Sequence, residues 1–597
     1  MNSIWIYQLL FSLTIIISIS LAISKIFRIE LTKSFFISIC SISLFIALLY
    51  ELNLYHLFLY SLALIAIIPF FFSNIRHQLL INKFIIFEFI FIILILHLFT
   101  YERILMDEDE LYFWGVKYKY FIMQLSDGSP YTEIIKEPYK GQHGKIPALF
   151  QTFITSFVGF NEGGAILANN IILTSGFYFL FGNKIKNLFH KFLYYVIFYL
   201  IINNLSFGFL SIYLDPIVGV SFAIMVYYIS NFFNYRDLRS VILLLIMIFF
   251  FINTHRISIL FVSFLLILLS IKSPYRHKKK LSIIMGCIGA VLIVIFHIWF
   301  FNTYSNDVLR IYDNFIKFIG NFDIFVNTIL FSKSYNSQFG VSYNAIANLL
   351  DIGLIKLPEY ILHNFIWYFF CVFLMYVTWD QTKKINTFFI IIFFIFAPLI
   401  SINKVYMNDT SPQVYGRYIS FLLIPIILVN LAYIEKKFDK KNIYLLLSII
   451  FFLTIITPKK TFGFFVTKNI YSNYDKWNKD YYSVREEYKK LLTKINQKFQ
   501  NKTLKIAVIF KHNGFQYDRH PSLYQSAMEL DFYPHHLTFI RAKSVMNSSF
   551  NIHHYTEKKH VWVFYNVEMN DYEIVHKLYN MKINEYPDTE IITFKTN

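Results

Sequence analysis

Long apolar runs separated by short basic loops make up the first three quarters of the chain. A hydrocarbon core of about 30 Å needs about 20 apolar residues per helix. Between successive basic loops there is room for two such crossings. We therefore predict an α-helical polytopic membrane protein with about 12–14 spans. The expected spans are residues 4–24, 34–52, 55–72, 84–100, 164–181, 192–206, 213–232, 241–252, 257–271, 281–301, 358–379, 385–402, 418–433 and 443–456.

The positions of the basic loops predict which helix ends face the cytoplasm, because cytoplasmic loops carry an excess of Lys and Arg. These loops are residues 25–33, 74–83, 183–191, 234–239, 272–280, 380–384 and 435–441. The alternation places the N-terminus, the segment 101–163, the loop 302–357 and the tail from residue 458 together on the outer side.

The tail changes character and predicts a small soluble α/β domain. The stretches "TLKIAVIF", "HVWVFY" and "EIITFKT" are typical of short strands, and an amphipathic helix over 476–499 precedes them. The chain then divides into N-terminal spans 1–100, an outer catalytic loop with interfacial helices 101–163, a transmembrane core 164–457 and an extracytoplasmic domain 458–597.

Composition agrees with a membrane protein and excludes nucleic acid as the expected partner. Only 15% of residues are charged and 56% are hydrophobic, against about 25% charged in soluble domains. The net charge of +18 comes from basic loops, which suit anionic membrane lipids. The three cysteines lie in apolar runs and have neither a disulfide nor a zinc spacing.

The densest negative charge lies where a predicted span ends. Asp107, Glu108, Asp109 and Glu110, here called the acidic stretch, directly precede the aromatic and basic sequence "LYFWGVKYKY". Acidic residues at a helix N-terminus are one explanation, because the helix dipole favours them. A functional explanation is a general base, or two carboxylates that bind a divalent cation such as Mg²⁺ or Mn²⁺. A helix over 108–123 would lie in the interface with Lys117 and Lys119 reaching to solvent.

Further polar residues fall on the same predicted side. His143 lies between two glycines in a turn, which either only returns the chain to the membrane or forms a wall beside the acidic stretch. Asp215 lies within a long apolar stretch, where an ionisable group indicates function. Because Pro216 follows it, Asp215 is also a predicted helix N-cap.

Three cations and a histidine complete this set. His255 and Arg256 occupy a short break between two apolar runs, and Lys404 and Arg417 precede a late span. An arginine at a membrane edge often reaches to headgroup phosphates. It also suits a phosphate leaving group. No cofactor follows from these residues, and Mg²⁺ or Mn²⁺ binding stays open.

The sequence "DEDELYFWGVKYK", the turn "GQHGKIPALFQTF" and the later "YGRYISFLLIP" resemble polytopic bacterial members of the GT-C glycosyltransferase superfamily. The resemblance covers residues 107–425. The double proline of the family's turn is missing here. Three additional spans precede the loop that the family carries after its first span.

The resemblance implies an inverting transfer of a sugar from a polyprenyl-phosphate donor to a cell-envelope glycan or lipid acceptor, such as lipopolysaccharide. Asp109, with Asp107 and Glu108 beside it, would supply the base. The binding residues would be His143, Asp215, His255, Arg256, Lys404 and Arg417. The expected location is the bacterial cytoplasmic (inner) membrane, with the active site on the periplasmic or extracellular side.

Two other functions are consistent with the same pattern. An O-antigen-type polymerase or ligase also uses outer loops and polyprenyl-linked sugars, but relies mainly on Arg and His. A lipid-linked glycan flippase or transporter would show inverted repeats and charges along its spans.

Overall fold

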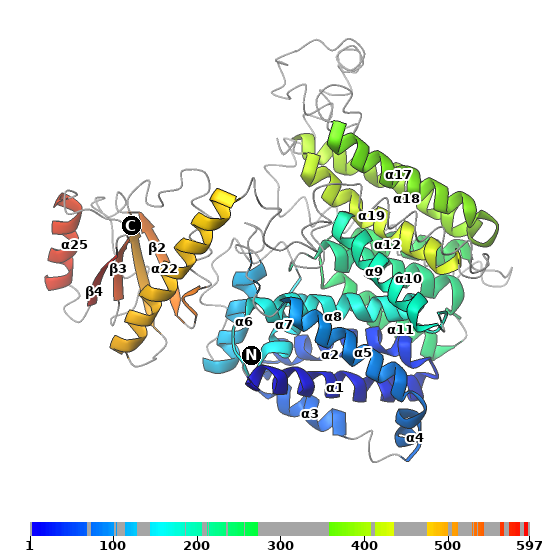
Figure 1. The fold of residues 1–597 in the computed structure, drawn as a ribbon, viewed down its shortest axis with the longest axis horizontal. Coiled ribbons are helices and arrows are strands. Elements are labelled where there is room, and N and C mark those ends of the chain that lie inside the picture. Colours follow the sequence, from blue (N-terminus) through cyan, green and yellow to red (C-terminus); the bar gives the residue numbers. More distant parts are fainter. Residues whose placement is uncertain are drawn as a thin grey trace, which may run out of the picture.

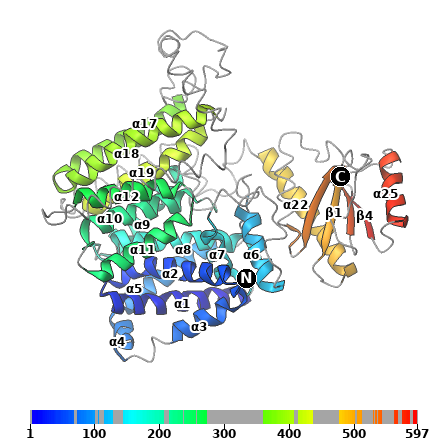
Figure 2. The same ribbon diagram turned by 180° about the vertical axis from the view of Figure 1, so that it is seen from behind.

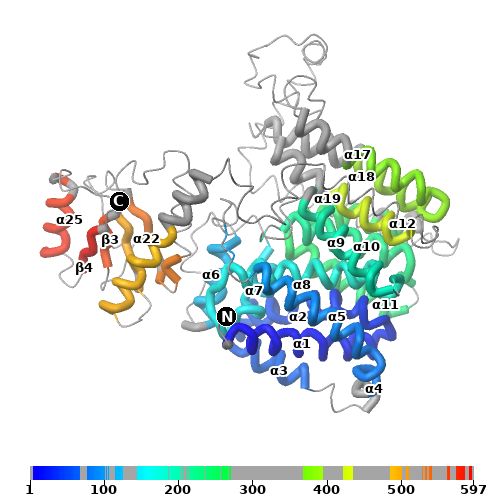
Figure 3. Tube along the Cα trace, in the orientation of Figure 1, coloured from blue at the N-terminus to red at the C-terminus, as the bar shows by residue number. Residues whose placement is uncertain are grey.

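The computed structural model is a helical bundle joined to a small parallel sheet (Figure 1), and Figure 3 follows the same chain as a tube. It describes residues 3–67, 73–100, 103, 105, 114–127, 144–185, 187–205, 212, 214–234, 237–255, 257–272, 358–406, 412–434, 475–499, 504–510, 528, 531–533, 535–541, 561–565, 572–584 and 590–594.

The helices of the bundle include one at the position of each predicted span in the described residues. They are α1 Ser3–Phe27, α2 Leu31–Glu51, η1 Tyr55–Leu57, α3 Phe58–Ile67, α4 Ser73–Ile81, α5 Lys83–Thr100, α6 Val116–Asp127, α7 Ile146–Thr155, α8 Glu162–Phe181, α9 Leu188–Leu205, α10 Asp215–Asn231, α11 Leu238–Ile252, α12 Ser258–Lys272, α17 Pro358–Val377, α18 Trp379–Tyr406 and α19 Pro412–Ile434. Helices α4, α6 and α7 lie between predicted spans. The predicted spans 281–301 and 443–456 and the loop 302–357 lie outside the described residues.

Four of the described helices are long and apolar enough to cross a membrane: Ile4–Phe27, Leu31–Glu51, Lys83–Thr100 and Glu162–Phe181. Several shorter apolar helices accompany them, among them Leu238–Ile252 and Phe421–Ile434. By length and composition these helices could span a membrane, as the sequence predicts. The count of 12–14 spans stays a prediction.

Helices α10 and α19 run parallel and in close contact. A Cβ atom on Gly219 of α10 would lie 3.0 Å from Cβ of Ile424 in α19. Twelve residues further along α10, Nδ2 of Asn231 donates to the hydroxyl of Tyr433 at 2.7 Å. Small residues at helix contacts let backbones approach closely inside a membrane.

Helix α8 runs in the same direction as α10. A Cβ on Gly176 would lie 2.5 Å from Val220, and the rings of Phe179 and Tyr228 lie 6.4 Å apart. The N-terminal ends of α8, α10 and α19 therefore face the same side of the bundle. We call this the domain end of the bundle, because the C-terminal domain and α6 lie beside the start of α8 (Figures 1 and 2).

The opposite end of the bundle, the basic end, holds several of the cations that the loop pattern assigns to the cytoplasm. The Lys33 ammonium lies 3.7 Å from the ring centroid of Phe232, just after α10. Lys184 lies 4.3 Å from the ring of Tyr227 and donates to the carbonyl of Ala432. The two classes of helix end that the sequence separates are thus separated in space.

The C-terminal domain holds a four-stranded sheet in which every strand pair is parallel. Its strands are β1 Lys505–Phe510, β2 His536–Arg541, β3 Val561–Tyr565 and β4 Glu590–Phe594, in the spatial order β2-β1-β3-β4. The predicted strands correspond to β1, β3 and β4, whereas β2 was not expected.

Helices cover both faces of this sheet, as a parallel sheet requires. Helix α22 (Asp475–Phe499) lies on one face (Figure 1), and its Tyr488 and Leu491 belong to the same buried cluster as Ile506 and Val508. Helix α25 (Tyr572–Asn584) covers the other face, where the buried cluster is Ala507, Ile509, Ile540, Trp562, Phe564, Leu578 and Met581.

Candidate functional site

Asp215 lies at the domain end, in the first turn of α10. Its side chain is buried, with 1% exposed. The residue before the helix is Leu214, which makes no side-chain cap, and Asp215 is the first helical residue. The prediction of Asp215 as N-cap is therefore wrong by one position, because Pro216 already lies within the first turn. A carboxylate there still benefits from the helix dipole.

His255 lies in the turn between α11 and α12 and faces Phe421 of α19. Its ring is 5% exposed and lies 5.8 Å from the ring of Phe421. Nδ1 accepts a hydrogen bond from the amide of Ile257 at 3.2 Å, so the proton of the neutral ring is on Nε2. Arg417 lies one helical turn before Phe421 on α19.

The glycine turn meets the same break between α11 and α12. The amide of Gly144 donates to the carbonyl of Thr254 at 3.3 Å. A Cβ on Gly144 would lie 1.5 Å from the carbonyl oxygen of Asn253, so only glycine fits there. Gly144, next to His143, is thus in contact with Thr254, next to His255. The sequence alone did not predict this contact.

Several predicted site residues lie outside the described part of the chain. These are Asp107, Glu108, Asp109, His143 and Arg256. Lys404 lies in α18 and Arg417 in α19, and only their backbone positions are described. The structure therefore brings Gly144 against the turn at Thr254 and His255 against Phe421 of α19, and it places Asp215 at the start of the neighbouring helix α10. It does not test the roles of the others.

The chain that leads into the acidic stretch is held at Leu105. Its amide donates to Oε2 of Glu162, the first residue of α8, at 2.5 Å. Its carbonyl accepts from Nη1 of Arg485 in α22 at 3.3 Å. Both backbone polar atoms of Leu105 are thus bound two residues before Asp107.

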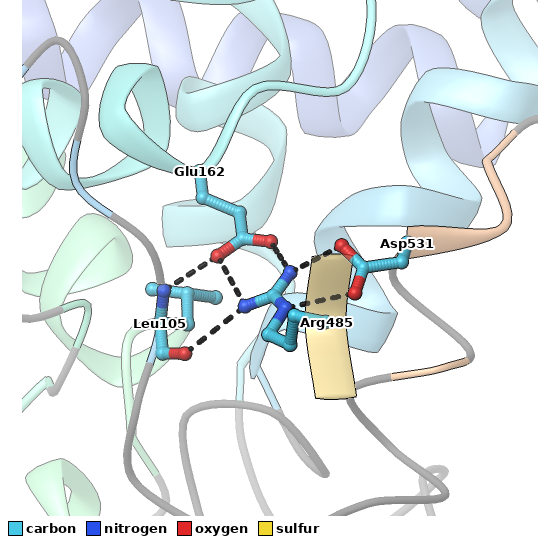
Figure 4. A network of polar contacts seen from close by, with 4 residues as sticks. All are labelled: Leu105, Glu162, Arg485 and Asp531. Atoms are coloured by element: carbon cyan, nitrogen blue, oxygen red, sulfur yellow. Dashed lines mark hydrogen bonds and ion pairs between the residues drawn. The ribbon is translucent and has the colours of Figure 1, made fainter. Parts of the chain in front are cut away.

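Arg485 joins two carboxylates from different parts of the protein (Figure 4). Its Nη1 donates to Glu162 Oε2 at 3.1 Å, and its Nη2 donates to Glu162 Oε1. On the other edge, Nε and Nη2 donate to Asp531 at 2.8 and 2.7 Å. The three side chains are 2%, 8% and 3% exposed. A planar guanidinium is the cation that can bind two carboxylates in this bidentate way.

Helix α6, which follows the acidic stretch, packs between the bundle and the C-terminal domain. The hydroxyl of Tyr118 lies 2.6 Å from Oγ1 of Thr155 in α7. Lys119 is fully buried and its ammonium donates to the carbonyl of His535 at 2.9 Å. Lys117 is also buried, and burial together with the charge of Lys145 lowers its pKa to about 8. The expectation that both lysines reach to solvent is wrong, because α6 lies under the domain.

Sequence reasoning missed Glu162, Arg485 and Asp531. Glu162 has a local signal, since Asn161 caps α8 by accepting from the amide of Gly164 at 2.6 Å and an acidic residue follows. Arg485 looks like one of many cations on an amphipathic helix. Its burial depends on the docking of two distant segments, which no local pattern shows.

Metal binding finds no support in the described part of the chain. No group of three His, Cys, Asp or Glu side chains there is arranged to hold an ion. Of the tail histidines, His535 is buried and hydrogen-bonded through both ring nitrogens, to Leu504 N and Asn496 Oδ1. Mg²⁺ or Mn²⁺ binding by the acidic stretch stays a prediction.

Comparison with known proteins adds no relative. No protein-family model, no curated protein and no solved structure matches the chain.

Proposed function

We propose that this protein is a membrane glycosyltransferase of the GT-C type, which moves a sugar from a polyprenyl-phosphate donor to a cell-envelope glycan or lipid acceptor. The observation that supports the proposal is that buried Asp215, buried His255 and the contact of Gly144 with Thr254 all lie toward the domain end of the bundle, where Leu105 also leads into the acidic stretch. The proposed location is the outer face of a bacterial cytoplasmic membrane.

The reaction needs one base and positive charge for the leaving group. A carboxylate of the acidic stretch, Asp109 or Asp107, takes the proton from the acceptor hydroxyl. The hydroxyl oxygen forms a bond to C1 of the sugar, and the bond from C1 to the phosphate oxygen breaks with inversion. Polyprenyl phosphate leaves with the electron pair, and Arg256, Arg417 and the Nε2–H of neutral His255 are the proposed stabilising groups.

The helix ends favour the same chemistry. The N-terminal ends of α8, α10 and α19 all point toward the domain end and carry partial positive charge, which stabilises anions near each of them. Asp215 lies at one of these ends, and we propose that it contacts sugar hydroxyls rather than the phosphate, because a buried carboxylate would repel phosphate. Lys404 and His143 complete the proposed binding set.

The decisive experiment measures release of polyprenyl phosphate from a panel of polyprenyl-phosphate hexoses by the protein in liposomes that also contain bacterial cell-envelope lipids and glycans as acceptors. Asp109→Asn or Asp107→Asn should lower turnover by about a hundredfold or more, the contribution expected of a general base. Glu51→Gln is the matched control, because this exposed carboxylate at the same end pairs with Lys145 at 2.7 Å. Wild-type turnover in both aspartate variants would contradict the catalytic assignment. Absence of release by the wild-type protein from every donor would contradict the donor class.

A further inference from the structure

The contacts of Arg485 connect the C-terminal domain to the chain that leads into the acidic stretch. Glu162 belongs to the membrane bundle, Asp531 belongs to the C-terminal domain, and Arg485 binds both while it also binds the carbonyl of Leu105. We propose that Arg485 is a positioning residue, which makes the placement of the backbone at Leu105 depend on docking of the C-terminal domain.

The burial of the cluster argues for a role beyond holding the domain in place. Two carboxylates and one guanidinium leave a net charge of −1 in a site where the side chains are at most 8% exposed. Taking such charges out of water costs free energy, and apolar residues often hold two surfaces together better. What the charged cluster adds is direction, because four hydrogen bonds to a planar fork fix the orientation of Glu162 and Asp531.

The orientation of Glu162 passes directly to the backbone of Leu105. Its Oε2 accepts both from the Leu105 amide at 2.5 Å and from Arg485 Nη1 at 3.1 Å. If Arg485 loses Asp531, its guanidinium loses two of the five hydrogen bonds described here and is held from one edge only. Glu162 and Leu105 then lose the group that aligns them, although neither touches Asp531 in the contacts described here.

The second flank of the acidic stretch is attached to the same domain. Lys119 of α6 donates to the carbonyl of His535, which immediately precedes β2, at 2.9 Å. Thus the chain is bound to the domain both before and after residues 107–110. The catalytic meaning of this coupling rests on the proposed function, whereas the coupling itself does not.

The test is amide hydrogen exchange of the full-length protein in lipid nanodiscs, compared over peptides that cover residues 101–113, β1 and β3. Asp531→Asn and Arg485→Gln should each raise exchange of 101–113 by about tenfold or more, because breaking a buried ion pair is strongly destabilising locally. Exchange of β1 and β3 should stay within about twofold of the wild-type protein for Asp531→Asn.

The matched control is Lys498→Gln. Lys498 lies on the same helix as Arg485 and also pairs with a carboxylate, Glu590, at 2.6 Å, but both side chains are about half exposed. Exposed ion pairs contribute little to stability, so this variant should leave amide exchange of residues 101–113 unchanged. Arg485→Lys should restore less than half of the protection, because an ammonium cannot bind both carboxylates in a bidentate way.

Three results would overturn the proposal. Wild-type exchange of 101–113 in Asp531→Asn is one. Equal protection in Arg485→Lys and wild type is another. The third is a rise at 101–113 only in step with β1 and β3, which would mean simple loss of the domain. These results are independent of sugar transfer. If the exchange prediction fails while Asp109→Asn abolishes turnover, only the coupling is wrong, and the reverse outcome would remove only the proposed reaction.

Discussion

His535 is a residue whose burial makes the stability of the C-terminal domain depend on pH. It is fully buried, and burial followed by the nearby charge of Lys119 lowers its pKa from 6.5 to about 4. Its Nδ1 accepts from the amide of Leu504, so protonation there would place two hydrogens against each other. The folded domain therefore keeps this ring neutral.

The sign of the effect follows from the lowered pKa. Between pH 6.5 and 4 the unfolded chain binds a proton that the folded domain does not, so stability falls as the pH falls through this window. From pH 7.5 to 5 we expect a loss of about 2 kcal/mol. The midpoint of thermal unfolding of the domain, measured at both pH values, checks this. His535→Asn should flatten the dependence, whereas His576→Asn, at an exposed histidine of α25, should keep it. An unchanged slope in His535→Asn would contradict the assignment.

At the scale of single residues, the sequence predicts which polar residues are buried between apolar runs. It predicts less well which residues they contact. Asp215 and His255 are buried at one end of the bundle, as their place between apolar runs indicates. The burial of Lys119 was not predicted, because the helix that carries it is amphipathic by pattern and only the docked domain covers its polar side. The burial of Arg485 was not predicted for the same reason.

The helices themselves were largely predictable, because an apolar run of span length has few alternatives in a membrane. Helices α8, α10 and α11 begin and end within about three residues of the predicted spans. The apolar runs could not predict which helices pack against each other, because every span is apolar on most sides. The parallel contact of α10 with α19 depends on single small residues that composition does not distinguish.

The contact between α10 and α19 gives a prediction at the scale of elements. A Cβ on Gly219 would lie 3.0, 3.1 and 3.2 Å from Cβ, Cγ2 and Cδ1 of Ile424. Gly219→Ala should therefore force the helices apart and destabilise the bundle by about 1–3 kcal/mol, the usual cost of overpacking. Thermal unfolding of the purified protein in detergent measures it.

Ile424→Ala in the same chain supplies the control for this contact. Removing Cγ2 and Cδ1 creates space, so the double variant should be more stable than the sum of the two single losses predicts. Additive losses would show that Gly219 does not meet Ile424. The contact matters for the site because Asp215 begins α10 and Phe421, three residues before Ile424 in α19, contacts His255.

At the scale of the whole molecule, the alternation of basic loops predicted which helix ends lie on the same side. Helix ends expected on one side meet at the domain end, and Trp5 of α1 joins them there, with its ring 5.0 Å from His97 of α5. The cations Lys33 and Lys184 lie at the basic end. The docking of the C-terminal domain on the domain end was beyond prediction, because it depends on buried pairs between residues more than 300 positions apart.

The last prediction concerns the side of the membrane that each end faces, on which the proposed reaction depends. Cysteine is placed at exposed positions of the domain end and C-terminal domain (Lys145→Cys, Glu590→Cys) and of the helix starts assigned to the cytoplasm (Arg239→Cys, Lys383→Cys). A membrane-impermeant maleimide added to intact cells should label the first pair at least about tenfold more than the second, because basic loops stay cytoplasmic. Opening the membrane should equalise the two pairs. The wild-type chain, in which Cys40 and Cys371 are buried, measures the background. Labelling of only Arg239→Cys and Lys383→Cys in intact cells would place the acidic stretch in the cytoplasm, and transfer from a polyprenyl-phosphate sugar on the outer face would then be contradicted.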